Sequence, residues 1–221
     1  MISEAKPLHV TGAPTSNWRT LFSRLGIAEL AATAVLDELA HAYSEPGRHY
    51  HNLDHIAALL ELLDRHGRRV RNRDAIELAI FFHDAVYVPT RSDNEAASAA
   101  LARTRLQELG ASDALVSEVE RLILATRHGA SIADADSDPD LALLLDLDLS
   151  ILGADRAAYA AYAHAIRREY AIVPDLLYRP GRRRVLAEFL ARPCIYATPR
   201  LRDLWEAAAR ANLQWESTTL A

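Results

Sequence analysis

Apolar residues recur at intervals of three and four along most of the chain, and no convincing stretch alternates with a period of two. Spacing of three and four places side chains on one face of an α-helix, whereas alternation is typical of a β-strand. The pattern therefore predicts an all-α fold. The expected helices cover residues 27–43, 53–66, 73–84, 93–110, 112–129, 141–152, 155–172, 182–191 and 200–215.

Polar residues mark several of the expected helix starts. Asn52, Ser112 and Asp138 each stand before an apolar periodic run, and Pro139 follows Asp138 at the first helical position. Short polar side chains at such positions accept hydrogen bonds from the free N–H groups of the first turn. Gly67 stands just past the helix expected at 53–66, where glycine commonly ends a helix.

The composition fits a single helical domain. Of the 221 residues, 50% are hydrophobic, only 7% are aromatic and 8 are glycine, a mixture that favours helix over strand. The chain shows no repeat, low-complexity segment or linker. We expect one domain spanning residues 1–221, with a core of about residues 27–152 and a C-terminal helical layer of about residues 155–215.

Charge and cysteine content limit the binding partners and the cellular compartment to be expected for the protein. A formal net charge of −5 argues against stable nucleic-acid binding. The single cysteine, Cys194, excludes an internal disulfide and suits a reducing compartment. The first residues lack a basic-then-apolar signal pattern, and no apolar run approaches the length of a membrane span. We expect a cytoplasmic protein without membrane contact, and homo-oligomer formation stays open.

Candidate chemistry begins with His55 and with the adjacent pair His83-Asp84, 28 positions after His55. The pair ends the apolar run 75–82, so its polar side chains arrive where the chain should be buried. Unpaired charge in such a place is costly, and a bound metal makes it tolerable. Imidazole and carboxylate suit a borderline divalent metal, which lowers the pKa of bound water. The pattern predicts a metal site.

The segment 50–55 reads Tyr-His-Asn-Leu-Asp-His, so His51 and His55 would share one face of a helix. With His83-Asp84 and a later aspartate, it resembles the HD superfamily of metal-dependent phosphohydrolases, whose pattern is His…His-Asp…Asp on an all-helical core. The segment is also similar to the Tyr-His-Asn-x-x-His motif of cyclic-nucleotide phosphodiesterases. The resemblance implies that His51 is a general acid and His55 a metal ligand. It is specific over residues 50–87 and weaker up to residue 152.

The closing aspartate of the pattern has two candidates. Asp146 and Asp148 are two positions apart, about 200° around a helix, so both cannot point at one ion. Like the usual aspartate of the superfamily, Asp148 precedes a further apolar turn, so we favour Asp148 and keep Asp146 as the alternative. The metal is then expected between the helices at 53–66, 73–84 and 141–152.

Two further residues are candidates for binding substrate. His128 closes the helix expected at 112–129, where it is either a phosphate contact or a cationic cap on helix carbonyls. It is the one good histidine between His83-Asp84 and the closing aspartate, which favours one metal over two. Arg182 lies in the basic stretch 179–184. This stretch either binds phosphate oxygens through bidentate arginine hydrogen bonds or forms a solvated charged face.

These residues and the resemblance predict metal-dependent hydrolysis of a phosphate ester or anhydride, with a nucleotide as the expected substrate. The expected ligands are His55, His83, Asp84 and Asp148. Mixed nitrogen and oxygen ligands suit Mn²⁺, Fe²⁺, Co²⁺ or Zn²⁺ better than Mg²⁺. Asp84 or Asp148 would steer the attacking water, and His51 would protonate the leaving oxygen.

Three alternatives remain at this point. A non-catalytic nucleotide-sensing HD module has no need of an intact ligand set. An HD-like di-iron oxygenase needs more histidine and aspartate ligands than the sequence offers. A purely structural helical protein leaves the polar pair within apolar helices unexplained.

Overall fold

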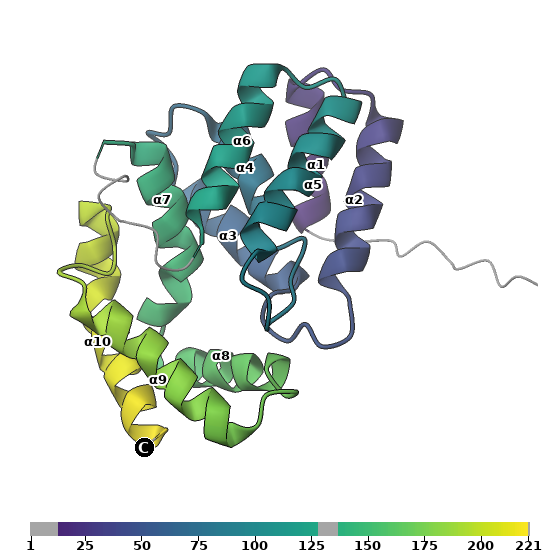
Figure 1. Ribbon diagram of the computed structural model, residues 1–221. Coiled ribbons are helices and arrows are strands. Elements are labelled where there is room, and N and C mark those ends of the chain that lie inside the picture. Colours follow the sequence, from purple (N-terminus) through teal and green to yellow (C-terminus); the bar gives the residue numbers. More distant parts are fainter. Residues whose placement is uncertain (1–12, 128–136, 221) are drawn as a thin grey trace, which may run out of the picture. The chain divides into compact units, whose positions relative to one another are not determined.

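The computed structural model describes residues 13–127 and 137–220, and within these ranges the regular structure is entirely helical, as expected (Figure 1). The helices are α1 (Ala13–Arg24), α2 (Glu29–Tyr43), α3 (Leu53–His66), α4 (Arg73–Phe82), α5 (Asn94–Glu108), α6 (Asp113–Ala125), α7 (Pro139–Asp148), the 3-10 helix η2 (Leu149–Gly153), α8 (Arg156–Glu169), α9 (Asp175–Ala191) and α10 (Pro199–Thr219). None of the described helices combines the length and apolar character that crossing a bilayer requires.

The expected helix caps are present. The side chain of Asn52 accepts hydrogen bonds from the backbone N–H groups of Asp54 and His55, at 2.9 and 3.3 Å. Ser112 caps α6 and Asp138 caps α7 in the same way. Because these side chains satisfy N–H groups that have no partner within the helix, they fix where each helix begins.

In the first half of the chain, the structure differs from the sequence prediction at α1 and at the end of α4, among other helix ends. Helix α1 was not predicted, although Trp18, Leu21 and Phe22 follow a helical spacing and are buried. Helix α4 ends at Phe82 rather than at residue 84, and His83 is its C-cap. His83 keeps helical backbone angles, and its N–H still donates to the carbonyl of Ala79 at 2.8 Å, so the chain departs from the helix only after His83.

Helix α9 begins at Asp175, well before the expected start at residue 182, and it continues through Pro180. A proline in a helix removes one backbone hydrogen bond and costs about 3 kcal/mol. Tyr178, Leu186 and Phe189 are buried on this helix, and this packing outweighs the local cost of the proline. Tertiary contacts therefore set this boundary, against the local preference of the sequence.

The contacts divide the described chain into two compact units. The N-terminal unit holds α1 to α6, and the C-terminal unit holds α7 to α10 together with residues 69–71. By this grouping, α7 belongs with the C-terminal helices.

Helix α4 is the centre of the N-terminal unit. Every residue from Ala75 to Phe82 is buried, and α4 contacts α3, α5 and α6, of which α5 and α6 lie side by side (Figure 1). A helix that is covered on several sides is apolar around most of its circumference. Its buried carboxylate, Glu77, pairs with Arg24 and Arg73. Because α4 is buried from Ala75 to its end, the residues that directly follow it begin in the interior.

The C-terminal unit is built around η2, which contacts α7, α8 and α10. Its buried core consists of Leu152, Tyr159, Leu186, Phe189, Ile195, Tyr196, Ala209 and Leu213. A Cβ atom on Gly153 would lie 2.5 Å from the Cβ atom of Trp205. The close approach of α10 to η2 therefore requires a glycine at this position.

Candidate metal centre

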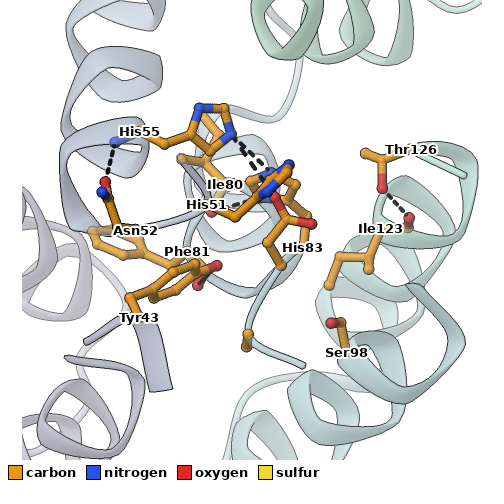
Figure 2. Close-up of polar contacts among 12 residues, drawn as sticks. Tyr43, His51, Asn52, His55, Ile80, Phe81, His83, Ser98, Ile123 and Thr126 are labelled. Carbon is orange, nitrogen blue, oxygen red and sulfur yellow. Dashed lines mark hydrogen bonds and ion pairs between the residues drawn. The ribbon is translucent and has the colours of Figure 1, made fainter. Parts of the chain in front are cut away.

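Three of the predicted ligands come together in the N-terminal unit. His55 lies in the first turn of α3, His83 is the C-cap of α4, and Asp84 follows it. Both histidines are buried, at 5% and 2% exposure, and the Asp84 side chain is 18% exposed. Figure 2 shows the rings of His55 and His83 approaching each other from different helices.

The separations of the ligand atoms suit a metal ion. The two Nε2 atoms of His55 and His83 lie 3.3 Å apart. Oδ2 of Asp84 lies 3.0 Å from Nε2 of His83 and 3.9 Å from Nε2 of His55. Ligand atoms about 2.1 Å from a common ion in tetrahedral or octahedral geometry are roughly 3.0–3.5 Å apart. Two of the three separations fall in this range, so a small shift of Asp84 would complete the group.

A second hydrogen bond fixes the state of His83. Its Nδ1 lies 3.0 Å from the carbonyl oxygen of Ile80, one turn earlier in α4. A carbonyl only accepts, so Nδ1 carries the hydrogen and donates it. The neutral ring then has its lone pair on Nε2, the atom that faces His55 and Asp84. Metal-binding histidines are held by the same kind of contact to a carbonyl or carboxylate.

The arrangement favours a cation on electrostatic grounds. A nitrogen lone pair, a second imidazole nitrogen and a carboxylate oxygen face one another in a largely buried place. Electron-rich atoms that converge away from water are stabilised by a proton or a metal ion between them. The group His55–His83–Asp84 could therefore hold a metal ion.

His51 lies beside this group without being part of it. Its ring centroid is 6.0 Å from that of His55 and 4.2 Å from the ring of Tyr87, on which it packs at 33°. His51 and His55 were expected to share one helical face, because they are four positions apart. That reason was wrong, because α3 begins at Leu53 and His51 precedes the cap residue Asn52. A loop, and not helical phase, brings His51 close to His55.

Arg48 and Tyr87 belong to the site, and sequence reasoning missed both. The Arg48 guanidinium donates hydrogen bonds to the backbone carbonyls of His51, Asp84 and Ala85. Tyr87 contributes the ring that packs on His51. The sequence signal for Tyr87 was its position in the loop directly after His83-Asp84.

Asp146 has a structural role within the C-terminal unit. It is 1% exposed, and its two carboxylate oxygens accept hydrogen bonds from the backbone N–H groups of Ala197 and Thr198, both at 2.7 Å. Thr198 is the N-cap of α10, so the carboxylate lies at the positive end of that helix. Burial raises the pKa of the Asp146 carboxyl, and the N–H donors from Thr198 and Ala197 oppose this shift.

The other predicted site residues stay predictions. Asp148 is the last residue of α7 and is half-buried in the C-terminal unit. Arg182 lies on α9, where it forms a two-pronged ion pair with Glu216 of α10 at 2.8 and 3.0 Å. This pair joins two helices of the C-terminal unit. His128 lies outside the described residues.

Comparison with known proteins finds no matching family model, no matching curated protein and no matching solved structure.

Proposed function

We propose that this chain is a metal-dependent phosphohydrolase of the HD type, which acts on a phosphate ester or anhydride of a nucleotide. The observation that carries the proposal is the buried group of His55, His83 and Asp84, whose ligand atoms converge within 4.8 Å. The fixed lone pair on Nε2 of His83 adds to it. Two neutral imidazoles and one carboxylate suit Mn²⁺, Fe²⁺, Co²⁺ or Zn²⁺ better than Mg²⁺.

His55, His83 and Asp84 would hold the ion, and Asp148 is proposed as the fourth ligand. When bound, such an ion lowers the pKa of coordinated water and polarises a phosphoryl oxygen. The protein contributes a rigid and largely dry setting, since both histidines are almost fully buried. Asp84 is partly exposed, so its carboxylate can accept a hydrogen bond from an incoming water molecule and orient it.

In the proposed reaction, a water oxygen attacks phosphorus while the bond from phosphorus to the leaving oxygen breaks. The water proton passes to a base, for which the Asp84 carboxylate is the proposed candidate. His51 donates a proton to the leaving oxygen, so that an ester gives an alcohol and a phosphate, and an anhydride gives two phosphates. No electron is gained or lost by any group. His51 is suited to this role because its half-buried ring lies near the ligand group but outside it.

The test combines metal analysis with a hydrolysis screen. Protein purified without added metal is analysed for transition metals, and then assayed with nucleotide mono-, di- and triphosphates and cyclic nucleotides in the presence of Mn²⁺. We expect bound metal and turnover of at least one of these substrates. Binding of metal and nucleotide without turnover would identify a sensor. Oxygen consumption with two irons per chain would identify an oxygenase, and absence of bound metal would overturn the proposal.

A matched control is available in the same unit. His41 lies on the exposed side of α2, in the last turn of that helix. His41→Ala removes an imidazole without touching the site, so it should leave metal content and turnover unchanged. The contrast with His55→Ala then separates loss of the site from nonspecific weak binding of metal to histidine.

A further inference from the structure

Arg48 connects the two chain segments that carry the site residues. Its guanidinium nitrogens lie 2.6 Å from the carbonyl oxygen of Asp84 and 2.9 Å from that of Ala85, both in the segment after α4. The same side chain reaches the carbonyl oxygen of His51 at 3.3 Å, in the loop before α3. A single side chain thus joins the loop of the proposed acid to the segment of a proposed ligand.

Arg48 is a buried side chain that contacts backbone carbonyls and two aromatic rings. Its side chain is 3% exposed, and the guanidinium lies over the rings of Tyr43 and Tyr87, at 5.2 and 5.5 Å from their centroids. The Glu45 carboxylate is half-exposed and lies 3.6 Å from Nε of Arg48, too distant for a hydrogen bond. The charge is therefore stabilised mainly by carbonyl dipoles and aromatic faces, which a planar guanidinium suits and an ammonium does not.

The chain turns sharply to bring Arg48 into this place. Gly47 has a φ of 101°, a value that favours glycine, and it follows Pro46. The N–H of Arg48 donates to the carbonyl of Glu45 at 3.2 Å, which closes a four-residue turn with Pro46 and Gly47 at its centre. Proline followed by a glycine with positive φ is the sequence of a type II turn.

Tyr87 is a shared contact of Arg48 and His51. The guanidinium carbon of Arg48 lies 5.5 Å from the centroid of the Tyr87 ring, and the centroid of the His51 ring lies 4.2 Å from it. Arg48 also donates to the carbonyls of Asp84 and Ala85, which lie three and two positions before Tyr87 in this segment. Moving Arg48 would therefore change both the support of His51 and the position of the ring on which His51 packs.

We infer that Arg48 is a positioning residue that holds His51 in place beside the metal group. This inference rests on the proposed function for its catalytic consequence, but the position of His51 can be measured without any activity. A displacement of about 1 Å in a catalytic group lowers the rate by roughly 10²-fold. Without Arg48, His51 would lose its backbone support while His55 and His83 would still be held by α3 and α4.

The experiment uses the full chain with Arg48→Met, which keeps an apolar stem, and Arg48→Lys, which keeps the charge. Imidazole signals are assigned by NMR in the protein loaded with Zn²⁺, which is diamagnetic. In the parent protein, the Tyr87 ring should shift the His51 ring protons upfield. We expect Arg48→Met to abolish this shift, Arg48→Lys to reduce it, and both to bind about one metal ion per chain. If Arg48→Met does not fold, Arg48→Lys decides the question.

A second experiment measures the activity of the variants on two substrates that differ in their leaving group. At saturating metal, kcat of Arg48→Met should fall by about 10–10²-fold for a substrate with an alcohol leaving group. The fall should be smaller with p-nitrophenolate, which leaves without protonation. A purely structural role would lower both rates equally.

Arg167→Met is the matched control. Arg167 also donates to two backbone carbonyls, of Tyr170 and Val173, and lies over the Tyr178 ring at 4.6 Å, but it belongs to the C-terminal unit. It should leave the His51 signals and both rates unchanged. An unchanged His51 shift in Arg48→Met, equal loss with both substrates, or loss of metal binding would each overturn the inference. If the parent hydrolyses nothing, the proposed function fails while the NMR result still decides the position of His51.

Discussion

The Nε2 atoms of His55 and His83 lie 3.3 Å apart, although the two residues are separated by 28 positions in the sequence. The separation is set by the packing of α3 on α4, because each histidine is anchored on its own helix. His83 is fixed further by its hydrogen bond to Ile80. The two candidate ligands are thus preorganised by the fold itself, which would lower the entropy cost of binding an ion.

The first prediction concerns metal content. We expect roughly one transition-metal ion per chain, and we expect His83→Ala or Asp84→Ala to reduce it by at least tenfold, because each removes one of the ligands. The measurement is elemental analysis of protein freed of loosely bound metal. His41→Ala should retain the metal of the parent protein. Full occupancy in both ligand variants would show that the metal binds elsewhere.

The second prediction separates Asp146 from Asp148. Asp146→Ala should lower the free energy of unfolding by about 2–4 kcal/mol, because it leaves two partly buried N–H groups without their charged acceptor. Asp148→Ala should abolish metal binding with a smaller effect on stability. Urea unfolding and metal titration of both variants measure the two effects. If Asp146→Ala empties the site while Asp148→Ala retains the ion, Asp146 is the ligand.

Local signals predicted the helices that begin with a polar cap. Helix α3 has the expected bounds, because Asn52 caps its start and Gly67 follows its end. Helix α9 was predicted too short, because Pro180 lies where a sequence pattern indicates a helix boundary. Tyr178, which lies on α9 before Pro180, is buried by the folded structure around it. The sequence alone does not indicate this burial, so it could not predict that the helix begins before the proline.

The candidate site also contains residues that the sequence predicted and residues that it did not. His55, His83 and Asp84 were predicted because their residue types carry metal chemistry in a recognisable order. Arg48 was missed because its partners, the carbonyls of Asp84 and Ala85, are backbone groups 36 and 37 positions away. Any residue type has such a carbonyl, so no sequence pattern could have indicated this contact.

The third prediction concerns alkaline pH. Burial raises the pKa of Tyr178 from its ordinary value of 10.0 to about 12, and burial also raises the pKa of Tyr159 and Tyr196. Between pH 10 and 12 the unfolded chain loses these protons while the folded protein keeps them. The folded state then binds more protons, so stability falls as the pH rises through this window.

Tyr178→Phe tests this assignment. It should reduce the slope of unfolding free energy against pH by up to one proton between pH 10 and 12, and it should leave the slope below pH 9 unchanged. Urea unfolding at half-unit pH steps measures the slope. An identical slope in the parent and the variant would show that Tyr178 ionises alike in the folded and unfolded states.

The last prediction separates the two histidines of the segment 50–55. His55 is a proposed ligand, so His55→Ala should remove the metal and abolish activity together. His51 lies outside the ligand group, with its ring centroid 6.0 Å from that of His55 and its ring packed on Tyr87. His51→Ala should therefore keep the metal and lower kcat by about 10²–10⁴-fold, the range for a lost general acid.

Leaving-group chemistry makes the test of His51 specific. A substrate with p-nitrophenolate as leaving group needs little protonation, so the loss of kcat in His51→Ala should shrink with that substrate. An alcohol leaving group needs the proton, so the loss should be large. Loss of metal in His51→Ala would make His51 a ligand. Retention of both metal and kcat would reduce it to a polar residue before α3, and the proton would then have to come from another group near the site.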